Sequence, residues 1–475
     1  MISILWLRRD LRLDDNPALS AAVANGSRVL PLYIHAPHEE ATWQPGGASD
    51  WWLHLSLKSL DRSLRDLGSR LFIARGDSLA ELRRVIAATG AGQVHWNRLY
   101  DPASRERDSL VKQTLRADGI RCASHNGALL SEPWEIRTAD GNPYRVFGAF
   151  WRNAVGRLAD TQPTDRPRTF HWASPGPHSL EIEDLGLKPD IPWDAGLRET
   201  WDPGEPSALA SAARFLDDRL DRYGADRDRP DLMGTTRLSP HLHFGEIGPR
   251  RLLAMIRASG ADPTTDPAEP LVRELGWREF AHHLLYHFPR TPTEPLDIRF
   301  ADFPWKQDDT QNRLRAWQQG RTGIPMVDAG MRELWHTGWM HNRVRMLVAS
   351  FLTKNLLLPW QEGARWFWDT LVDADLAANT LGWQWTAGCG ADAAPYFRVF
   401  NPVLQGQRFD PDGAYVKRWC PELAGLPLKY LHQPWTAPKA ILTAAGVTLG
   451  SNYPYPLVDL AASRKEALAA WETIK

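Results

Sequence analysis

Residues 2–35, ISILWLRRDLRLDDNPALSAAVANGSRVLPLYIH, hold two apolar runs separated by a short helical pattern. The runs at 2–7 and 28–35 have the length and apolar content of buried strands. The segment 17–25 begins with a proline after Asn16 and is followed by Gly26, the order expected for a helix start and stop. This stretch therefore predicts a strand, a helix and a second strand, the unit from which parallel sheets are built.

The same alternation continues to about residue 125. Further strands are predicted at 70–75, 93–97 and 120–125, and helices at 50–68, 77–90 and 103–119. We therefore predict that residues 1–130 form a Rossmann-like α/β domain, with a parallel sheet covered on both faces. No glycine-rich phosphate loop follows the first strand, and an α/β fold by itself assigns no function.

The remainder of the chain has a different pattern. Residues 157–206 contain eight prolines and little periodicity, so we predict an inter-domain connector over 131–206. From 207 to 475 the apolar spacing is helical, and no second run of strand-like segments occurs. The fold prediction is thus an α/β domain, a long connector and an all-α domain.

Composition excludes several protein classes. A chain of 475 residues with 43% hydrophobic and 24% charged residues is typical of a folded soluble protein. No apolar run is long enough to cross a bilayer, and the N-terminus lacks a secretory pattern, so a cytoplasmic location is expected. The three cysteines are widely spaced, and no histidine cluster has metal-ligand spacing, so neither disulfides nor a metal site is predicted.

Charge does not by itself identify a partner. The formal net charge is −1, although residues 313–354 hold seven Lys or Arg against two acidic residues. That local excess fits a phosphate-binding surface, but it fits an ordinary solvated helix face equally well.

The stretch LVDADLAANTLGWQW, residues 371–385, brings polar and aromatic side chains close together. Asp373, Asp375 and Asn379 are followed by Trp383 and Trp385. One interpretation is a loop and a helix start capped by Asp. The other is a site for a flat, electron-rich ligand that is polar at its edge.

Three further polar clusters occur in the helical part. They are Thr235, Thr236, Arg237 and Ser239 at an expected helix start; Glu274, Trp277 and Arg278 on one helix side; and Asn342, Arg345 and Met346 on another. The first cluster suits a diphosphate, because hydroxyls and free backbone N–H groups converge there, or it is only an N-cap. Ten of the 23 tryptophans lie between residues 277 and 385. Most of these indoles are expected in the core, yet those beside Arg and Asn also suit stacking on bases or on an isoalloxazine ring.

The motifs YGADRDRPDLMGTTRLSPHLHFGEI, ELGWREF, GIPMVDAGMRELWHTGWMHNRVRMLVASFL, DADLAANTLGWQW and DAAPYFRVFNP resemble the photolyase/cryptochrome family. The N-terminal LWLRRDLRLDDNPAL resembles the start of its antenna domain, and the resemblance extends from about residue 2 to about 460. It implies an α/β antenna domain followed by a helical domain that holds FAD in a folded conformation.

The resemblance also implies cofactor-binding residues. Those expected to hold FAD are Tyr223, Thr235, Thr236, Arg237, Leu238, Ser239, Arg278, Asn342, Arg345, Asp373, Asp375 and Asn379. Arg278 and Arg345 are expected to balance the buried Asp carboxylates. Asn379 corresponds to the position that faces the flavin N5, where plant cryptochromes carry Asp, and so favours repair over signalling.

The implied substrate is ultraviolet-damaged DNA with a flipped cyclobutane pyrimidine dimer. The substrate-binding residues are expected to be Arg227, Glu274, Trp277, Asn342, Arg343, Met346 and Trp385. Trp277 and Trp385 are expected to stack on the bases, Glu274 and Asn342 to bond to their edges, and Arg227 and Arg343 to contact phosphates. Enzymes for the (6-4) lesion typically place a His pair over the substrate, which Asn342 and Met346 do not match.

The implied reaction is electron donation from light-excited reduced FAD to the dimer, with Glu274 and Asn379 at the site. Trp383, Trp360 and Trp305 match the family's electron-transfer chain, and Tyr396 is a side route.

Similarity to the plant-cryptochrome-like branch, whose bacterial repair enzymes are called class III, implies a methenyltetrahydrofolate antenna, with 8-hydroxy-5-deazaflavin as the alternative. Asp101 stands where other members carry a longer acidic folate contact, and Trp51 and Trp52 either stack on the antenna or pack in the core.

The competing function is a cryptochrome-like photoreceptor without repair activity. The chain lacks a long polar tail. We expect a monomer.

Overall fold

The computed structural model describes residues 1–167, 171–173, 179–307, 312–393 and 397–475. Its N-terminal sheet has the strand order β3-β2-β1-β4-β5, with every pair parallel. The strands are β1 (Ile2–Leu7), β2 (Arg28–His35), β3 (Phe72–Arg75), β4 (Gln93–Asn97) and β5 (Arg121–His125). The helices between them are α1 (Pro17–Val23), α2 (Gly47–Asp66), α3 (Ser78–Thr89) and α4 (Pro102–Ala117). The predicted parallel α/β domain is confirmed.

Helices cover both faces of this sheet, because alternate residues of each strand point to opposite sides. From β1, Leu5 and Leu7 pack in a cluster with α1 and α2, whereas Ile4 and Trp6 pack with α3 and α4. Local capping marks the helix ends: Asp77 accepts a hydrogen bond from the Ala80 N–H, and α3 ends at a left-handed glycine.

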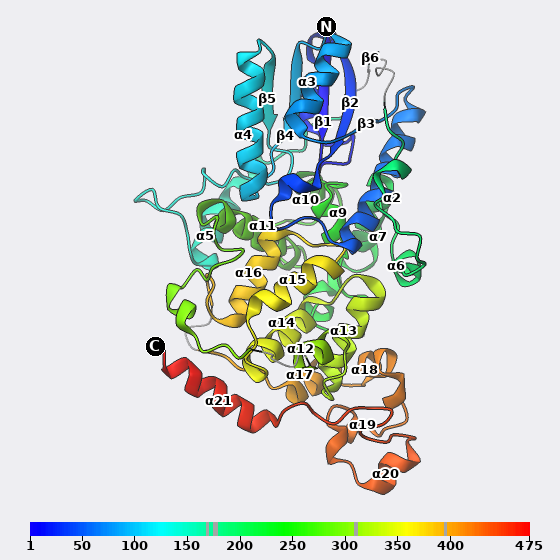
Figure 1. Ribbon diagram of the computed structural model, residues 1–475, viewed down its shortest axis with the longest axis vertical. Coiled ribbons are helices and arrows are strands. Elements are labelled where there is room, and N and C mark those ends of the chain that lie inside the picture. Colours follow the sequence, from blue (N-terminus) through cyan, green and yellow to red (C-terminus); the bar gives the residue numbers. More distant parts are fainter. Residues whose placement is uncertain (168–170, 174–178, 308–311, 394–396) are drawn as a thin grey trace.

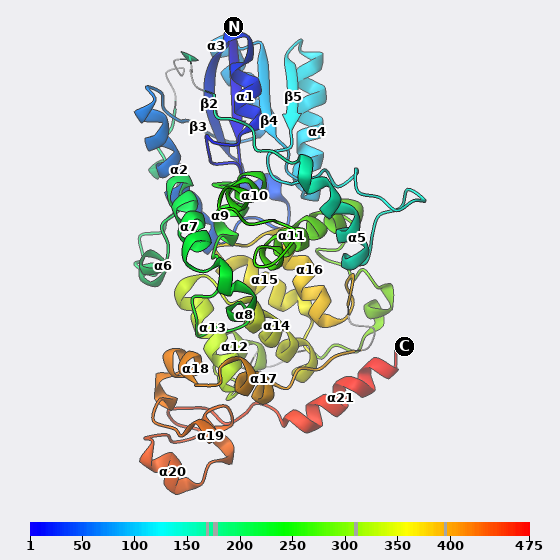
Figure 2. The ribbon, with the colours of Figure 1, turned by 180° about the vertical axis from the view of Figure 1, so that it is seen from behind.

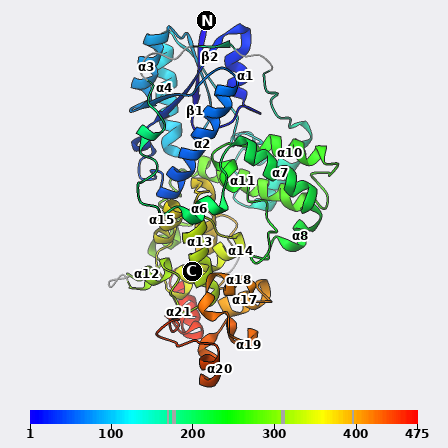
Figure 3. The ribbon, with the colours of Figure 1, turned by 90° about the vertical axis from the view of Figure 1, so that its right-hand side faces the viewer.

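The C-terminal half is helical and lies beneath the sheet domain in Figure 1. Figure 3 shows α7, α10 and α11 to one side of the column formed by α13, α14 and α15. The helices from 205 onward are α7 (Glu205–Asp218), α8 (Tyr223–Asp226), α9 (Ser239–His243), α10 (Pro249–Ala258), α11 (Glu269–His287), α12 (Asn312–Gln318), α13 (Pro325–Thr337), α14 (Asn342–Ser350), α15 (Trp360–Thr370), α16 (Leu376–Ala387), α17 (Pro402–Phe409), α18 (Ala414–Trp419), α19 (Leu428–Leu431), α20 (Lys439–Ala444) and α21 (Leu460–Glu472). A π-helix, Phe351–Asn355, continues α14. No helix in the described ranges combines the length and apolar character needed to span a membrane.

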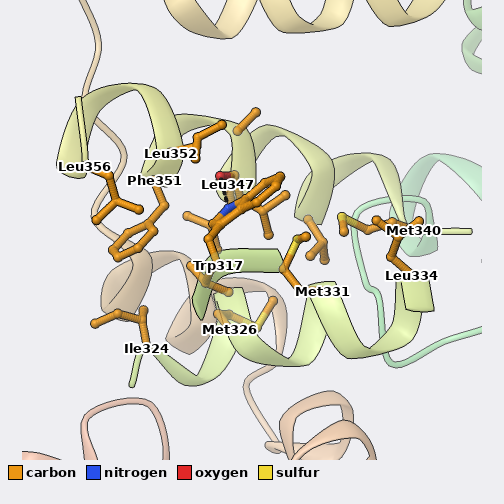
Figure 4. Close-up of a cluster of buried hydrophobic side chains, with 14 of the residues drawn as sticks. Trp317, Ile324, Met326, Met331, Leu334, Met340, Leu347, Phe351, Leu352 and Leu356 are labelled. Carbon is orange, nitrogen blue, oxygen red and sulfur yellow. Dashed lines mark hydrogen bonds between the residues drawn. The ribbon is translucent and has the colours of Figure 1, made fainter. Parts of the chain in front are cut away.

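The core of the helical half contains one of the predicted core tryptophans. Trp317 of α12 is fully buried among apolar side chains of α13 and α14 (Figure 4). Its Nε1 donates to the Val348 carbonyl at 3.0 Å. The indole is therefore a packing residue with its one polar atom satisfied.

The connector has more structure than its proline content indicated. Its strand β6 (His171–Trp172) pairs with the start of β2, a pairing that the low periodicity of this stretch did not indicate. The helix α5 (Phe147–Ala154) packs against α11 in both Figure 1 and Figure 2, and a short helix, α6 (Ala195–Thr200), follows. Periodicity could not reveal a two-residue strand, because pairing across a sheet is not a local property. The domain boundaries at 130 and 206 stay a prediction.

The two halves meet through the Arg12 side chain and through backbone groups. Arg12 donates to the Gly245 carbonyl at 2.8 Å, and the Leu11 N–H donates to the Phe244 carbonyl at 3.1 Å. A Cβ at Gly245, where φ is +67°, would lie 2.3 Å from the Arg9 carbonyl oxygen. Glycine is required here both by the left-handed turn and by the close approach of two segments of the chain.

Candidate functional site

The helix α16 presents the predicted carboxylates at its N-terminus. Asp375 is its N-cap, because its side chain accepts a hydrogen bond from the Ala378 N–H at 2.8 Å. Asp373 is buried, and both of its oxygens accept from Arg345 Nη2, at 2.8 and 3.0 Å. The capping interpretation of Asp375 is thus correct, and the predicted pairing of Arg345 with a carboxylate is confirmed.

Asp375 lies between two histidines. Its Oδ2 is 3.5 Å from His243 Nδ1 and 3.6 Å from His282 Nε2. Burial alone would raise the pKa of Asp375, but His282, His243 and Arg278 outweigh it and hold that pKa well below its usual value. The closest partners of Arg278 differ from those expected: its Nη1 donates to the Ala128 carbonyl at 2.8 Å and is 3.6 Å from Glu279. Asp375 therefore remains an anion in contact with two buried imidazoles.

In the stretch 234–247, residues 234–238 form an irregular segment that leads into the short helix α9. Arg237 has φ +53°, and its guanidinium lies 5.5 Å from the Trp201 ring centre and 4.7 Å from that of Trp339. Ser239 is the first residue of α9 and accepts from Trp339 Nε1 at 3.3 Å. The N-cap explanation for this cluster is wrong, since no side chain caps α9. The Thr236 hydroxyl accepts from the Leu238 N–H at 3.3 Å.

The hydroxyl and backbone N–H groups at the start of α9 fit a diphosphate. The first turn of α9 has N–H groups without a side-chain cap; Ser239 is its first residue, and Thr235 lies four residues before it. On α16, Asn379 donates to the Ala364 carbonyl at 3.0 Å, which fixes its side chain. Tyr223 is buried against Phe215 and lies near Arg227. These residues could hold the diphosphate, ribityl and ring portions of a flavin nucleotide.

The helix α11 carries the first group of predicted substrate residues. Glu274 and Trp277 lie one turn apart and are both partly exposed. The Trp277 ring stacks in parallel on Phe147 of α5, with centres 3.7 Å apart and an interplanar angle of 9°. Glu274 accepts a hydrogen bond from Arg227. The connector therefore supports one face of the proposed stacking residue.

The helices α14 and α16 carry the second group. Asn342, Arg345 and Met346 share one side of α14, as predicted, and Asn342 is exposed. Trp385 on α16 is partly buried, and its Nε1 donates to the Asp392 carbonyl at 3.0 Å. Arg343 pairs with Asp228 at 2.7 Å. Arg227 and Arg343 are thus already paired with carboxylates and would have to exchange these partners for phosphates.

The predicted electron-transfer tryptophans differ in burial. Trp383 and Trp360 are buried, whereas Trp305 is partly exposed. The Trp383 ring lies against Gly363 of α15, one turn from Trp360, and its Nε1 has no hydrogen-bond partner among the described residues. Tyr396, the proposed side route, lies outside the described residues.

Comparisons with known proteins identify the family of the chain. A family model described as DNA photolyase matches residues 3–168, and one described as the FAD binding domain of DNA photolyase matches 271–473. The deoxyribodipyrimidine photo-lyase of Agrobacterium fabrum is 46% identical over 99% of this chain and 98% of that protein. The chain belongs to the photolyase and cryptochrome family.

Two further relatives place it within that family. A crystal structure of a bacterial class III photolyase from Agrobacterium tumefaciens matches with a TM-score of 0.95 and 45% identity, covering 99% of this chain and 97% of that one. Cryptochrome-1 of Arabidopsis thaliana is 42% identical over 96% of this chain and 68% of that protein. The predicted resemblance is confirmed, and the FAD-binding domain model supports the predicted FAD.

The basic stretch at 313–354 is not one phosphate-binding surface. Lys354 is buried, and its ammonium donates to the Ala387 carbonyl at 2.5 Å and lies 3.0 Å from the Phe397 ring centre. Burial lowers the pKa of Lys354 well below its usual value. Sequence position alone could not separate this lysine from the surface arginines beside it.

Trp51 and Trp52 pack in the core, which is the second of the two alternatives that the sequence left open. Both are fully buried, and their Nε1 groups donate to Asp194 at 2.9 Å and to Glu246 at 3.0 Å.

A cavity lies at the carboxyl ends of β1 and β2, and it extends to the helical half. Its lining includes Trp6, Tyr33, His35, Trp43, Glu40 and Trp368. Asp101 does not line it; that carboxylate is buried and pairs with Arg9.

Several residues of this site escaped sequence reasoning. Phe147 supports Trp277 from the connector, and His243 and His282 flank Asp375 from two other segments. No local pattern marks them, since each acquires its role only from a distant partner. His282 belongs to the helically spaced histidines 282, 283 and 287, for which core or surface positions and no metal site are predicted.

Proposed function

We propose that this protein repairs cyclobutane pyrimidine dimers in DNA by light-driven electron transfer from reduced FAD. The observation that carries the proposal is the arrangement of α11, α14 and α16. Most of the residues proposed to contact the lesion, and Arg278, Arg345 and Asn379 of those proposed to hold the flavin, lie on these helices, and α16 packs on each of the other two. The similarity to photo-lyases along the whole chain supports the same function.

The flavin, when bound and excited by light, supplies the electron that opens the cyclobutane ring. The protein supplies position and charge. Arg345 and Asp373 neutralise each other, and Asn379, held by the Ala364 carbonyl, would offer the flavin ring an amide that cannot ionise. Asn379 would therefore favour a reduced, anionic flavin.

On the lesion side, Trp277 and Trp385 would stack on the two flipped bases. The parallel stack on Phe147 holds Trp277 before DNA arrives, so less freedom is lost on binding. Glu274 and Asn342 would accept and donate hydrogen bonds at the base edges. Met346 would pack on the cyclobutane ring, which is apolar.

An antenna chromophore is part of the proposal. Methenyltetrahydrofolate, or alternatively 8-hydroxy-5-deazaflavin, would bind in the cavity lined by Trp6, Tyr33, His35, Trp43 and Trp368. Aromatic walls suit a planar ring, and the cavity lies between the sheet and the helical half. We also propose that the protein acts as a monomer in the cytoplasm, where DNA is accessible.

The test is repair by the purified, flavin-loaded protein. The protein is photoreduced with a thiol and mixed with ultraviolet-irradiated oligothymidine, and recovery of thymine absorbance is followed under light. Repair that depends on light and on flavin reduction is the expected result. Photoreduction without dimer loss would favour the photoreceptor function instead.

A further inference from the structure

A large surface groove lies among α12, α13, α15 and α18, away from the flavin and lesion residues. Its volume is about 1150 Å³, which is ample for a nucleotide-sized ligand. The residues used below are Trp305, Lys306, Arg315, Arg332, Trp335 and Trp366. None of them belongs to the proposed flavin or lesion pocket except Trp305, the outermost member of the proposed electron route.

The groove presents a preformed aromatic stack. Trp335 of α13 and Trp366 of α15 are nearly parallel, with ring centres 5.9 Å apart and an angle of 6°. Trp335 is 68% exposed, whereas most indoles in folded proteins are largely buried. An exposed indole held in place by a second one is a suitable platform for a planar aromatic ring.

The groove is also positively charged. Lys306, Arg315 and Arg332 line it, together with a single acid, Glu362. Lys306 pairs with Glu466 and Arg332 with Glu422, but Arg315 has no ion-pair partner in the described part of the chain. A planar ring stacked on Trp335 could therefore place attached phosphates beside Arg315.

Trp305 gives this groove a functional connection. In the proposed route each photon draws an electron through Trp383 and Trp360 from Trp305, which must then be refilled from outside the protein. Trp305 lines the groove itself, so a ligand bound there would contact the residue that needs the electron. This step rests on the proposed function.

We propose that the groove binds a reduced nicotinamide nucleotide that supplies electrons to Trp305. Two photons move two electrons, one at a time, and the dihydronicotinamide releases one proton. The net reaction is NADH + FAD → NAD⁺ + FADH⁻, in which the nicotinamide is oxidised and the flavin is reduced. Electrons and protons balance without another reductant.

The experiment measures NADH binding and NADH-dependent photoreduction of the flavin-loaded protein under blue light, which NADH does not absorb. Saturable acceleration by NADH and competition by NAD⁺ are expected. Trp335→Ala should weaken binding by about tenfold, and Arg315→Gln should weaken it as well. Both variants should keep normal photoreduction with a thiol. Trp193→Ala, which removes a 38% exposed indole outside the groove, is the matched control and should bind NADH normally.

Two outcomes would overturn the inference. One is NADH binding or photoreduction that is unchanged in both groove variants. The other is concentration-dependent self-association that Trp335→Ala abolishes, since a second copy would then occupy the groove. Thiol-driven photoreduction and dimer repair are measured in the same samples, so a failure of the proposed function would be visible separately from a failure of NADH binding.

Discussion

Replacing Gly363 by alanine tests the contact between α15 and α16 that positions Trp383. A Cβ at Gly363 would lie 2.0 Å from Trp383 Cη2 and 2.4 Å from its Cζ3. An ordinary carbon–carbon contact needs about 3.5 Å, so the indole or the helix would have to move by roughly 1.5 Å. Trp383 has little room, because it is 2% exposed and meets Phe367 and Trp317 edge-on, with ring centres 5.0 and 6.1 Å away.

The expected magnitude combines two opposing effects. Overpacking costs about 1–3 kcal/mol, and for a confined aromatic ring the upper part of that range applies. Alanine in place of glycine inside a helix recovers about 1 kcal/mol. We therefore expect Gly363→Ala to lower the free energy of unfolding by about 1–2 kcal/mol. We also expect slower photoreduction, because Trp383 is displaced from its place in the proposed route.

The assay is urea unfolding of the flavin-loaded protein, with the photoreduction rate measured in parallel. Gly148→Ala on α5 is the matched control, since the nearest atom to its new Cβ is the mobile end of Arg152, at 3.8 Å. The control should be as stable as the wild type or slightly more stable. A Gly363→Ala protein with wild-type stability and wild-type photoreduction would refute the tight packing of Trp383 against α15.

Three further changes have distinct expected outcomes. Trp383→Phe should lose most of its photoreduction rate yet repair normally once chemically reduced; normal photoreduction would exclude this residue from the route. Glu274→Gln should weaken binding of ultraviolet-damaged oligothymidine by about tenfold without lowering thermal stability, and equal binding by titration would remove Glu274 from the lesion site. Burial, together with neighbouring charge, lowers the pKa of His283 to about 4. The Nε2 atom of His283 accepts a hydrogen bond from the Tyr144 N–H at 3.0 Å, and its Nδ1 lies 3.2 Å from the Pro133 carbonyl oxygen. Because the folded-state pKa of His283 is below the unfolded value of about 6.5, the neutral imidazole stabilises the folded protein above that pH. Its contribution to the free energy of unfolding, up to about 3 kcal/mol, is lost as the pH falls from about 6.5 towards 4. Urea unfolding of His283→Gln should therefore depend less steeply on pH than that of the wild type over this interval, and identical pH profiles would contradict the assignment.

The sequence determined the secondary structure of the α/β domain and much of the site's local chemistry. Five strands, their intervening helices and the cap at Asp375 followed from periodicity and from side chains that act within one turn. Such features are local, so the residues that create them are adjacent in the chain. The motifs on α11, α14 and α16 were found for the same reason: a helix side repeats every three to four residues.

Only the tertiary structure decided which distant segments meet. An indole has the same sequence pattern whether it packs in a core, as Trp52 does, or stacks in the open, as Trp335 does. The support of Trp277 by Phe147 and the pairing of β6 with β2 likewise join segments more than a hundred residues apart. Burial and partner choice depend on how whole elements pack, and packing is a property of the assembled chain.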